Sequence, residues 1–516
     1  MKVRVSTENV VESKEHTQTD SLGVWLQKAE AIGEVKKITA EVDPDLEMST
    51  VAYLSGKEAG SPALLFENIK AHPGHRALYN MLGNSINRVA LAIREEPGQS
   101  GLGIVKVLKE KMKRRMPPKV VAAEDASVNR NTELGEDVDL TQFPAPKMWP
   151  LDGGKYIGTA DAVITQNPDS GRTNLGTYRH MIKSRDQVGF YVSPGKDALL
   201  DREAWWNRGE PAPVAAVYGL DPLLFIVSAT TFPKNASEYE SFGGINGAPI
   251  EVFKSDVTGL MLPANAEIII EGFTHPDKTF PEGPFGEFTG YYGRPSGPTP
   301  YIDVHAVRYK KDPILTCALM ADGIANECGL FWGMSKAAKV WADLQALGVP
   351  GVQGVWSPPE AAGWGVTVVS IKQLYAGHAA QTMALAAQCM GGAYFTKYVI
   401  VVDDDVDPSN LSDVLWALAT RSRPAQAIDI LRETWSTYLD PSLNPPEIRP
   451  WGSKCLINAC KEFRHIKEFA RRTKLSKPVY EQVVERWKEL GFEDEPPKVD
   501  AFEGPTVVSL PADGGA

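Results

Sequence analysis

Residues 281–287 read Pro-Glu-Gly-Pro-Phe-Gly-Glu, and residues 174–179, further upstream, read Asn-Leu-Gly-Thr-Tyr-Arg. On a continuous strand, the offset between Glu282 and Glu287 would send the two carboxylates to opposite faces. The two glycines and the proline between them disfavour an uninterrupted strand and favour a turn. The pattern therefore predicts that both carboxylates fold back toward one pocket.

Two carboxylates that share a pocket do not both ionise easily. An arginine beside one of them, here Arg179, holds that carboxylate charged, while burial raises the pKa of the other into the range where it exchanges protons. The sequence thus predicts an acid–base site. The competing interpretation is an exposed Gly-Pro turn flanked by surface glutamates, with Arg179 in an ordinary ion pair.

The composition narrows the class of protein. A chain of 516 residues, 43% hydrophobic and 23% charged, is long enough for two or three globular domains. A net charge of −11 argues against a nucleic-acid-binding protein or one that grips an anionic membrane, so small molecules are the expected partners. Five cysteines without a CxxC pair predict reduced thiols in a cytoplasmic enzyme.

The N-terminal sequence does not suggest export. The first twenty residues are polar and lack both the apolar core of a secretion signal and the pattern of a transit peptide. The longest apolar stretches, such as 383–387, fall well short of the roughly 18 residues of a membrane span. We therefore expect a cytoplasmic protein that is not integral to a membrane.

The first two thirds of the chain contain two regions with different sequence patterns. Helical periodicity and short apolar runs from Ser21 to Ile93 predict a mixed α/β opening, and 107–119 reads as a basic helix closed by two prolines. Between Gly154 and Lys310, short β-like runs separated by Gly, Pro and Asn favour a barrel or sandwich. These runs are 162–164, 188–192, 215–218, 224–227, 267–271 and 302–306.

After Pro313 helices and strands alternate, which is typical of an α/β domain. Helices are expected over 335–347 and 377–390, and strands over 366–371 and 397–402. Residues 457–490 read as mostly helical, with Cys455 and Cys460 as packed thiols on a helical pattern. Residues 493–516 read as an acidic tail that contains Pro and Gly.

Taken in order, the segments 174–179, 282–287 and 396–407 resemble the UbiD-type family of reversible decarboxylases, and the resemblance spans most of the chain. It implies a mixed α+β fold whose central split β-barrel binds a flavin. The implied domains are an N-terminal α/β segment, the barrel, an α/β oligomerisation domain and a C-terminal tail, at residues 1–130, 131–315, 316–485 and 486–516.

The resemblance also implies the cofactor and the reaction. The cofactor is prenylated FMN, bound through its phosphate to Mn²⁺ or a similar divalent metal and to K⁺, and supplied by a separate flavin prenyltransferase. The reaction is the non-oxidative, reversible decarboxylation of an unsaturated acid, which releases carbon dioxide. Arg179 and Glu282 are the implied ion pair beside the cofactor, and Glu287 is the implied acid–base group that protonates the carbon left behind.

Asn174 and Glu238 match the metal ligands of the family, and oxygen ligands suit a hard cation that holds a phosphate. The family often has a histidine ligand after the segment that corresponds to 188–193, where this chain has none. That position falls on Lys196, a cation for phosphate, or on Asp197, which can ligate the metal. The remaining implied contacts are Thr177, Tyr178, Arg179 and Lys397 for the cofactor, and oxygens around Ala229 and Thr230 for K⁺.

The motif spelling is closer to family members that act on aromatic or heteroaromatic acids than to the fungal cinnamate enzymes. Phe288, Phe331 and Trp332 are candidate pocket walls, with core packing as the alternative for the last two. The family suggests homodimers or hexamers. Decarboxylation of cinnamate-type acids, a non-catalytic flavin- or phosphate-binding scaffold and a metal-dependent phosphohydrolase stay open as alternatives, although the last leaves the two glutamates unexplained.

Three other patterns carry weaker predictions. His72-Pro-Gly-His75 reads as a surface turn rather than a metal site. The aspartates at 403–407 read as a strand end rather than a calcium loop, because proline stands where such a loop requires glycine. His180, next to Arg179, is a candidate lining residue of the pocket.

Overall fold

The computed structural model describes residues 21–232, 236–443, 451–499 and 501–502. The N-terminal segment 1–20 and most of the predicted tail, 503–516, lie outside these residues. The chain divides into two compact units, residues 1–460 and 461–516, which are treated separately below.

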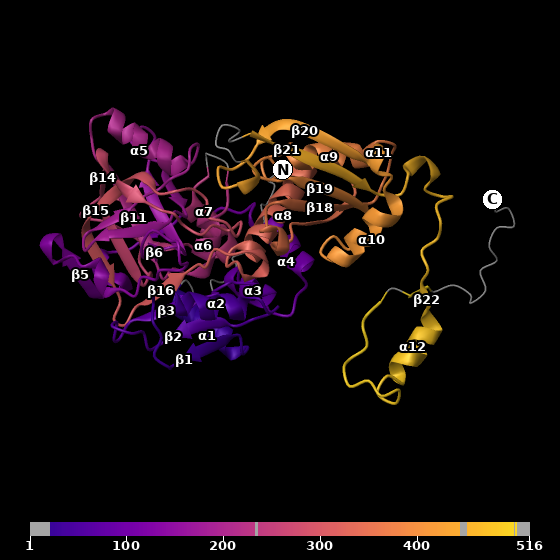
Figure 1. Cartoon of the computed structure of the whole chain (residues 1–516), viewed down its shortest axis with the longest axis horizontal. Helices are drawn as coiled ribbons and strands as arrows, with labels where there is room; N and C mark the ends of the chain where they lie inside the picture. The colour runs from indigo at the N-terminus through magenta and orange to yellow at the C-terminus, as the bar shows by residue number, and fades with distance from the viewer. Residues whose placement is uncertain (1–20, 233–235, 444–450, 500, 503–516) are drawn as a thin grey trace, which may run out of the picture. The chain divides into compact units, whose positions relative to one another are not determined.

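The chain opens with a small α/β layer, as predicted (Figure 1). Its four-stranded sheet has the order β1-β2-β3-β16, so a strand from much later in the chain completes it. Ser21, Ser85 and Ser100 cap three of its helices by accepting backbone N–H bonds. The elements are β1 Val35–Ile38, β2 Ala63–Phe66, β3 Arg76–Tyr79, β16 Ile314–Cys317, α1 Leu22–Ala31, α2 Glu47–Gly56, α3 Ile86–Ala92 and α4 Gly101–Lys111.

A nine-stranded antiparallel sheet forms the centre and curls into a half-barrel, which confirms the β-rich middle of the chain. The order is β6-β9-β10-β15-β14-β11-β7-β8, with β5 paired to β15. The strands are β5 Asn131–Leu134, β6 Tyr156–Gly158, β7 Asp161–Gln166, β8 Thr173–Gly176, β9 His180–Ser184, β10 Gln187–Gly189, β11 Ala212–Tyr218, β14 Ile268–Glu282 and β15 Gly297–Tyr309. A smaller sheet contains β4 Lys119–Val120, β12 Glu251–Lys254 and β13 Met261–Pro263.

One predicted strand is wrong. The run 224–227 lies in a helix, α6 Pro222–Ser228, which Asp221 caps by accepting from the Leu223 N–H at 2.8 Å. Every residue of α6 is buried, so its apolar run has no periodicity that separates helix from strand. The cap and the proline at the first helical position were the usable signal. Two further helices, α5 Asp197–Asn207 and α7 Glu238–Asn246, belong to this region.

The next region is an α/β domain, as predicted, with sheet order β17-β18-β19-β21-β20. Its strands are β17 Val352–Trp356, β18 Val366–Ile371, β19 Tyr398–Asp403, β20 Ile428–Trp435 and β21 Trp451–Ala459, and its helices are α8 Gly329–Ala346, α9 His378–Gln388, α10 Leu411–Arg421 and α11 Pro424–Ala427. α9 lies against β19 and β21 on one face, and α10 covers part of the other through Val414 and Ala417.

The prediction that 457–490 is mostly helical is wrong. The first residues belong to β21, which pairs in parallel with β19, so Cys455 lies on a strand. In the second unit, the helix is α12 Lys477–Glu485, beside a short parallel pair of β22 Leu475–Ser476 and β23 Ala501–Phe502. The apolar run that opens the segment is flanked by strands on both sides, and this long-range pairing decides its structure.

Candidate active site

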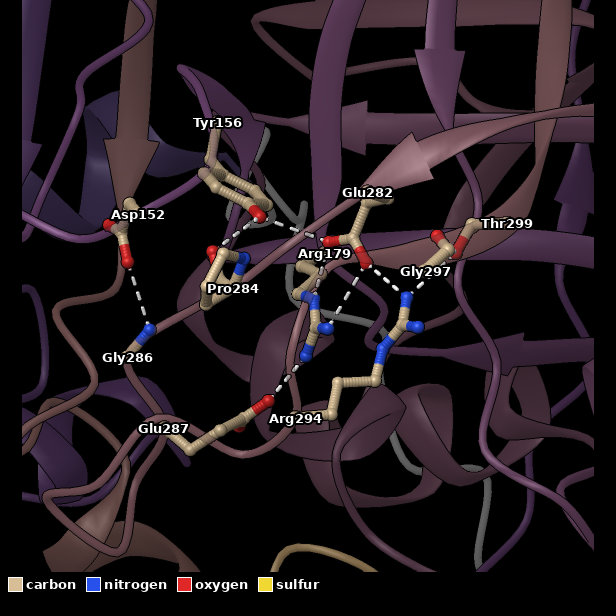
Figure 2. A network of polar contacts seen from close by, with 10 residues as sticks. All are labelled: Asp152, Tyr156, Arg179, Glu282, Pro284, Gly286, Glu287, Arg294, Gly297 and Thr299. Atoms are coloured by element: carbon tan, nitrogen blue, oxygen red, sulfur yellow. Dashed lines mark hydrogen bonds and ion pairs between the residues drawn. The ribbon is translucent and has the colours of Figure 1, made fainter.

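The two glutamates lie at the end of the longest strand of the half-barrel. Glu282 is the last residue of β14, and the chain then turns at Gly283, whose φ of +88° suits glycine. An isolated β-bridge between Gly286 and Tyr292 closes the turn. Glu287, the next residue, therefore lies near the point where the turn begins. Arg179 immediately precedes β9 and reaches both carboxylates (Figure 2).

Arg179 joins the two glutamates as a single fork. Its Nε and Nη2 donate to Oε1 and Oε2 of Glu282 at 2.8 and 3.2 Å, and its Nη1 donates to Oε1 of Glu287. Glu282 also accepts from the Tyr156 hydroxyl at 3.0 Å and from Arg294 Nη2 at 2.5 Å. The predicted convergence on one pocket is thus what the structure shows.

The two carboxylates differ electrostatically. Glu282 is 1% exposed, and although burial acts to raise its pKa, the charge and hydrogen bonds of Arg179, followed by the charge of Arg294, hold that pKa below its usual value. Burial raises the pKa of Glu287, and the charges of Glu282 and Asp152 add to this effect against the opposing Arg179. The pair therefore consists of a carboxylate kept ionised and a carboxyl group poised to hold a proton.

Backbone contacts hold the turn between them. Asp152 Oδ1 accepts from the Gly286 N–H, and the Gly153 N–H donates to the Pro284 carbonyl, both at 2.9 Å. A Cβ on Gly153 would lie 2.2 Å from the Gly283 carbonyl oxygen, so only glycine fits there. Asp152 and Tyr156 were not predicted from the sequence, because nothing local marks residues that act through such distant partners.

Aromatic rings surround the site. The guanidinium groups of Arg179 and Arg294 lie 4.7 and 4.1 Å from the centroid of the Tyr191 ring, a cation–π arrangement. Next to Glu287, the buried Phe288 contacts the rings of Trp332, Trp364 and Phe395, with centroids 5.4–5.8 Å apart.

Two of the three residues predicted to line the pocket belong to this group of rings. Phe288 and Trp332 are adjacent, whereas Phe331 is fully buried against Phe225 in the core. Lys454 fixes the segment that leads to Phe395. Its Nζ donates to the carbonyls of Ala387, Gly392 and Ala393 at 2.6–2.9 Å.

The three residues predicted to bind metal lie close together. The Leu175 N–H, next to Asn174, donates to Glu238 Oε2 at 3.2 Å, and burial together with the charge of Asp197 raises the pKa of Glu238 to about 7. Asp197 pairs with Arg172 at 3.3 Å. Among the described residues, no group of three or more His, Cys, Asp and Glu is arranged to hold a metal ion.

The other predicted cofactor residues are not all in one place. Thr177 Oγ1 donates to the Asp161 carbonyl, and the Tyr178 N–H donates to Asp161 Oδ1, at 3.2 and 3.1 Å. Lys196 Nζ lies 4.8 Å from the Tyr394 ring, and burial lowers the pKa of this lysine. Lys397 instead pairs with Asp440 and Ser442, at 2.9 and 2.7 Å, in a cavity of about 330 Å³.

The weaker candidates have structural partners. His72 is bonded to the Gln142 carbonyl oxygen, and the aspartates 403 and 405 both pair with Arg421. His180 is fully buried between Asp161 and Tyr218. Ala229 and Thr230 follow α6, where the Thr230 hydroxyl donates to the Ile226 carbonyl at 2.6 Å. No helix in the described residues is long and apolar enough to cross a membrane.

Three family models match consecutive parts of the chain. They describe the N-terminal, Rift-related and C-terminal domains of 3-octaprenyl-4-hydroxybenzoate carboxy-lyase and match residues 26–108, 119–322 and 329–459. Fold and site together define a carboxy-lyase. The chain belongs to the UbiD family.

Solved structures agree with this assignment. The vanillic acid decarboxylase of Sedimentibacter hydroxybenzoicus is 28% identical with a TM-score of 0.80, covering 91% of this chain and 98% of that one. The UbiD-class enzyme HmfF of Pelotomaculum thermopropionicum, in complex with FMN, is 26% identical with a TM-score of 0.79, covering 89% and 98%. An evolved dimeric form of HmfF, in complex with prFMN, is 25% identical with a TM-score of 0.77, covering 89% and 99%.

Proposed function

We propose that this protein catalyses the reversible, non-oxidative decarboxylation of an aromatic or heteroaromatic carboxylic acid with prenylated FMN. The observation that carries the proposal is the Arg179 fork, which joins the ionised Glu282 to Glu287, whose pKa is raised. In this reaction the bond between the ring carbon and the carboxylate breaks, carbon dioxide leaves, and a proton replaces it.

The protein's part is to supply that proton. Glu287 donates it to the carbon that has lost carbon dioxide and becomes a carboxylate, which Arg179 stabilises through the bond already present at Oε1. In the carboxylation direction, the same carboxylate removes the proton. Glu282 accepts four hydrogen bonds and stays ionised, so it orients Arg179 and does not compete for the proton.

Prenylated FMN would supply an electron sink for the pair that the substrate carbon holds as carbon dioxide departs. Asn174, Glu238 and Asp197 would hold the divalent metal at its phosphate, because their donors are the hard oxygens that Mn²⁺ and Mg²⁺ prefer. We assign Thr177, Tyr178, Lys196 and Lys397 to the cofactor and the oxygens around Ala229 and Thr230 to K⁺, by resemblance. The FMN and prFMN of the HmfF structures support the flavin.

The rings beside Glu287 favour an aromatic substrate. Phe288 packs edge-to-face on Trp332 and Phe395 and at a tilt on Trp364, so an apolar aromatic cluster lies next to the proton donor. The likeness to a vanillic acid decarboxylase supports the same class. The five cysteines, all free thiols, support a cytoplasmic location.

One assay tests the function. The chain is produced with a flavin prenyltransferase and offered benzoic, phenolic, heteroaromatic and cinnamic acids, with and without Mn²⁺ and K⁺. We expect bound flavin, release of carbon dioxide from one aromatic class, and loss of flavin on chelation. Turnover of cinnamates alone would contradict the substrate class, and a protein that holds no flavin would contradict the proposed reaction.

We also propose that the chain assembles through the sheet of the region 329–459. Tyr398, Cys455 and Ile430 are paired across three strands and share one face, which Ile428 extends. Tyr398, Ile428 and Ile430 are 40–48% exposed, so α10 does not cover this part of the sheet. An apolar sheet face of this kind marks an association surface, and a second copy of the chain is the proposed occupant.

Ile430→Asp is expected to convert this assembly to a monomer, because a charge in the centre of an apolar interface is costly to bury. Light scattering gives the molar mass, and Leu54→Asp, at an exposed position of α2, is the matched control. A wild-type protein that is already monomeric would contradict the assembly.

A further inference from the structure

A second arginine, Arg294, contacts the site. Arg294 lies in the loop that runs from Glu287 to β15 and reaches Glu282 on the side away from Tyr156 (Figure 2). Its Nη2 donates to Glu282 Oε2 at 2.5 Å and to Thr299 Oγ1 at 2.7 Å. Thr299 is fully buried, and the guanidinium lies on the Tyr191 ring, so two anchors hold the arginine in place.

The hydrogen bonds at Glu282 show what this arginine adds. A carboxylate offers about four acceptor positions, and Glu282 fills them with Tyr156, two N–H groups of Arg179, and Arg294. Arg179 therefore does not neutralise Glu282 alone. Its third arm, Nη1, is left to bind Glu287.

We propose that Arg294 is a positioning residue for the reaction: it neutralises Glu282, so that Arg179 stays shared with Glu287, and it gives the cluster the excess positive charge that a substrate carboxylate requires. The part of this inference that concerns substrate rests on the proposed function. The part that concerns Glu287 rests on the contacts alone.

The charges of the cluster support the second half of the proposal. With Glu287 protonated, two arginines face one carboxylate, and the cluster carries one excess positive charge that attracts an acid substrate. After the proton leaves Glu287 the cluster is neutral. Without Arg294, the same two states would be neutral and negative, which disfavours both substrate binding and ionisation of Glu287.

No other described cation replaces Arg294. The further titratable groups that face the two glutamates are Asp152, Tyr156 and Tyr394, which are acids. Lys196 lies over the Tyr394 ring, and no hydrogen bond or ion pair joins it to either glutamate in the described residues. Loss of Arg294 should therefore reach Glu287 through Glu282 and the shared Arg179, with no second cation to offset it.

Arg294→Gln tests this directly. Infrared titration of the cofactor-loaded, substrate-free protein follows the Glu287 carboxyl band, which Glu287→Gln identifies by its absence. We expect the band to titrate about one pH unit or more higher in Arg294→Gln, because a nearby positive charge is gone. In turnover, the alkaline limb of kcat/KM should move the same way, and KM should rise about tenfold.

Two variants and one control complete the test. Arg294→Lys keeps the charge and should restore most of the titration, whereas Arg185→Gln, at an exposed arginine in the turn between β9 and β10, should leave the Glu287 band unchanged. If Arg294→Gln does not fold, Arg294→Lys and Thr299→Val, which removes one anchor, carry the comparison. A folded Arg294→Gln with an unshifted band overturns the proposal. Absence of turnover in the wild type counts against the proposed function only, since the band is read without substrate.

Discussion

Glu287→Gln is expected to lower kcat for decarboxylation by about 10²–10⁴-fold, with flavin content and folding unchanged. Glutamine keeps the size of the side chain and can still accept from Arg179, but it has no acidic proton to give. The wild type should lose decarboxylase activity as pH rises through the raised pKa of Glu287, because only the protonated form acts as the acid. It should also lose activity at low pH, when Glu282 becomes protonated.

Exchange of the product hydrogen isolates the proton step. In D₂O and without carbon dioxide, the wild type should replace the product C–H by C–D, and Glu287→Gln should not. The matched control is Glu271→Gln, which breaks another buried Glu–Arg pair on the same strand, between Glu271 and Arg308 at 2.8 Å. That variant should lose stability and keep the exchange. Exchange at the wild-type rate in Glu287→Gln would assign the proton to another group.

The sequence predicted the centre of the site because the chemistry of its motif is local. Two glutamates around a Gly-Pro turn needed only one arginine to predict a shared acid–base site, and the structure places all three side chains together. The residues that complete the site, Tyr156, Asp152 and Arg294, could not be found in this way. Each acts across a contact that exists only when separate strands and loops meet.

The fold shows the same division. Short β-like runs identified most strands of the half-barrel, but α6 was misread because a fully buried helix has no polar face to set a period. β21 was misread because charged residues after it mimic an amphipathic helix, while its pairing with β19 and β20 decides the strand. A buried apolar run can therefore be a helix or a strand, and its partners elsewhere in the chain decide which.

Arg179→Lys is expected to lower kcat/KM by about 10²–10³-fold, which is the usual effect of removing one preorganised donor. The guanidinium is a flat fork whose three nitrogens each donate, two to Glu282 and one to Glu287. A lysine ammonium is a compact point charge and cannot bridge both carboxylates in that geometry. Lysine should therefore keep Glu282 ionised but lose the hydrogen bond to Glu287.

Comparison with Arg179→Met separates charge from geometry. Methionine leaves two buried carboxylates with Arg294 as their nearest cation, so this variant should lose about 3–5 kcal/mol of stability as well as activity. Arg179→Lys should unfold close to the wild type in denaturant titration while its turnover stays low, and Arg185→Lys serves as the surface control. Wild-type turnover in Arg179→Lys would mean that a single positive charge suffices at this position. The acid–base role of Glu287 would then depend on burial, not on the bridge to Glu282.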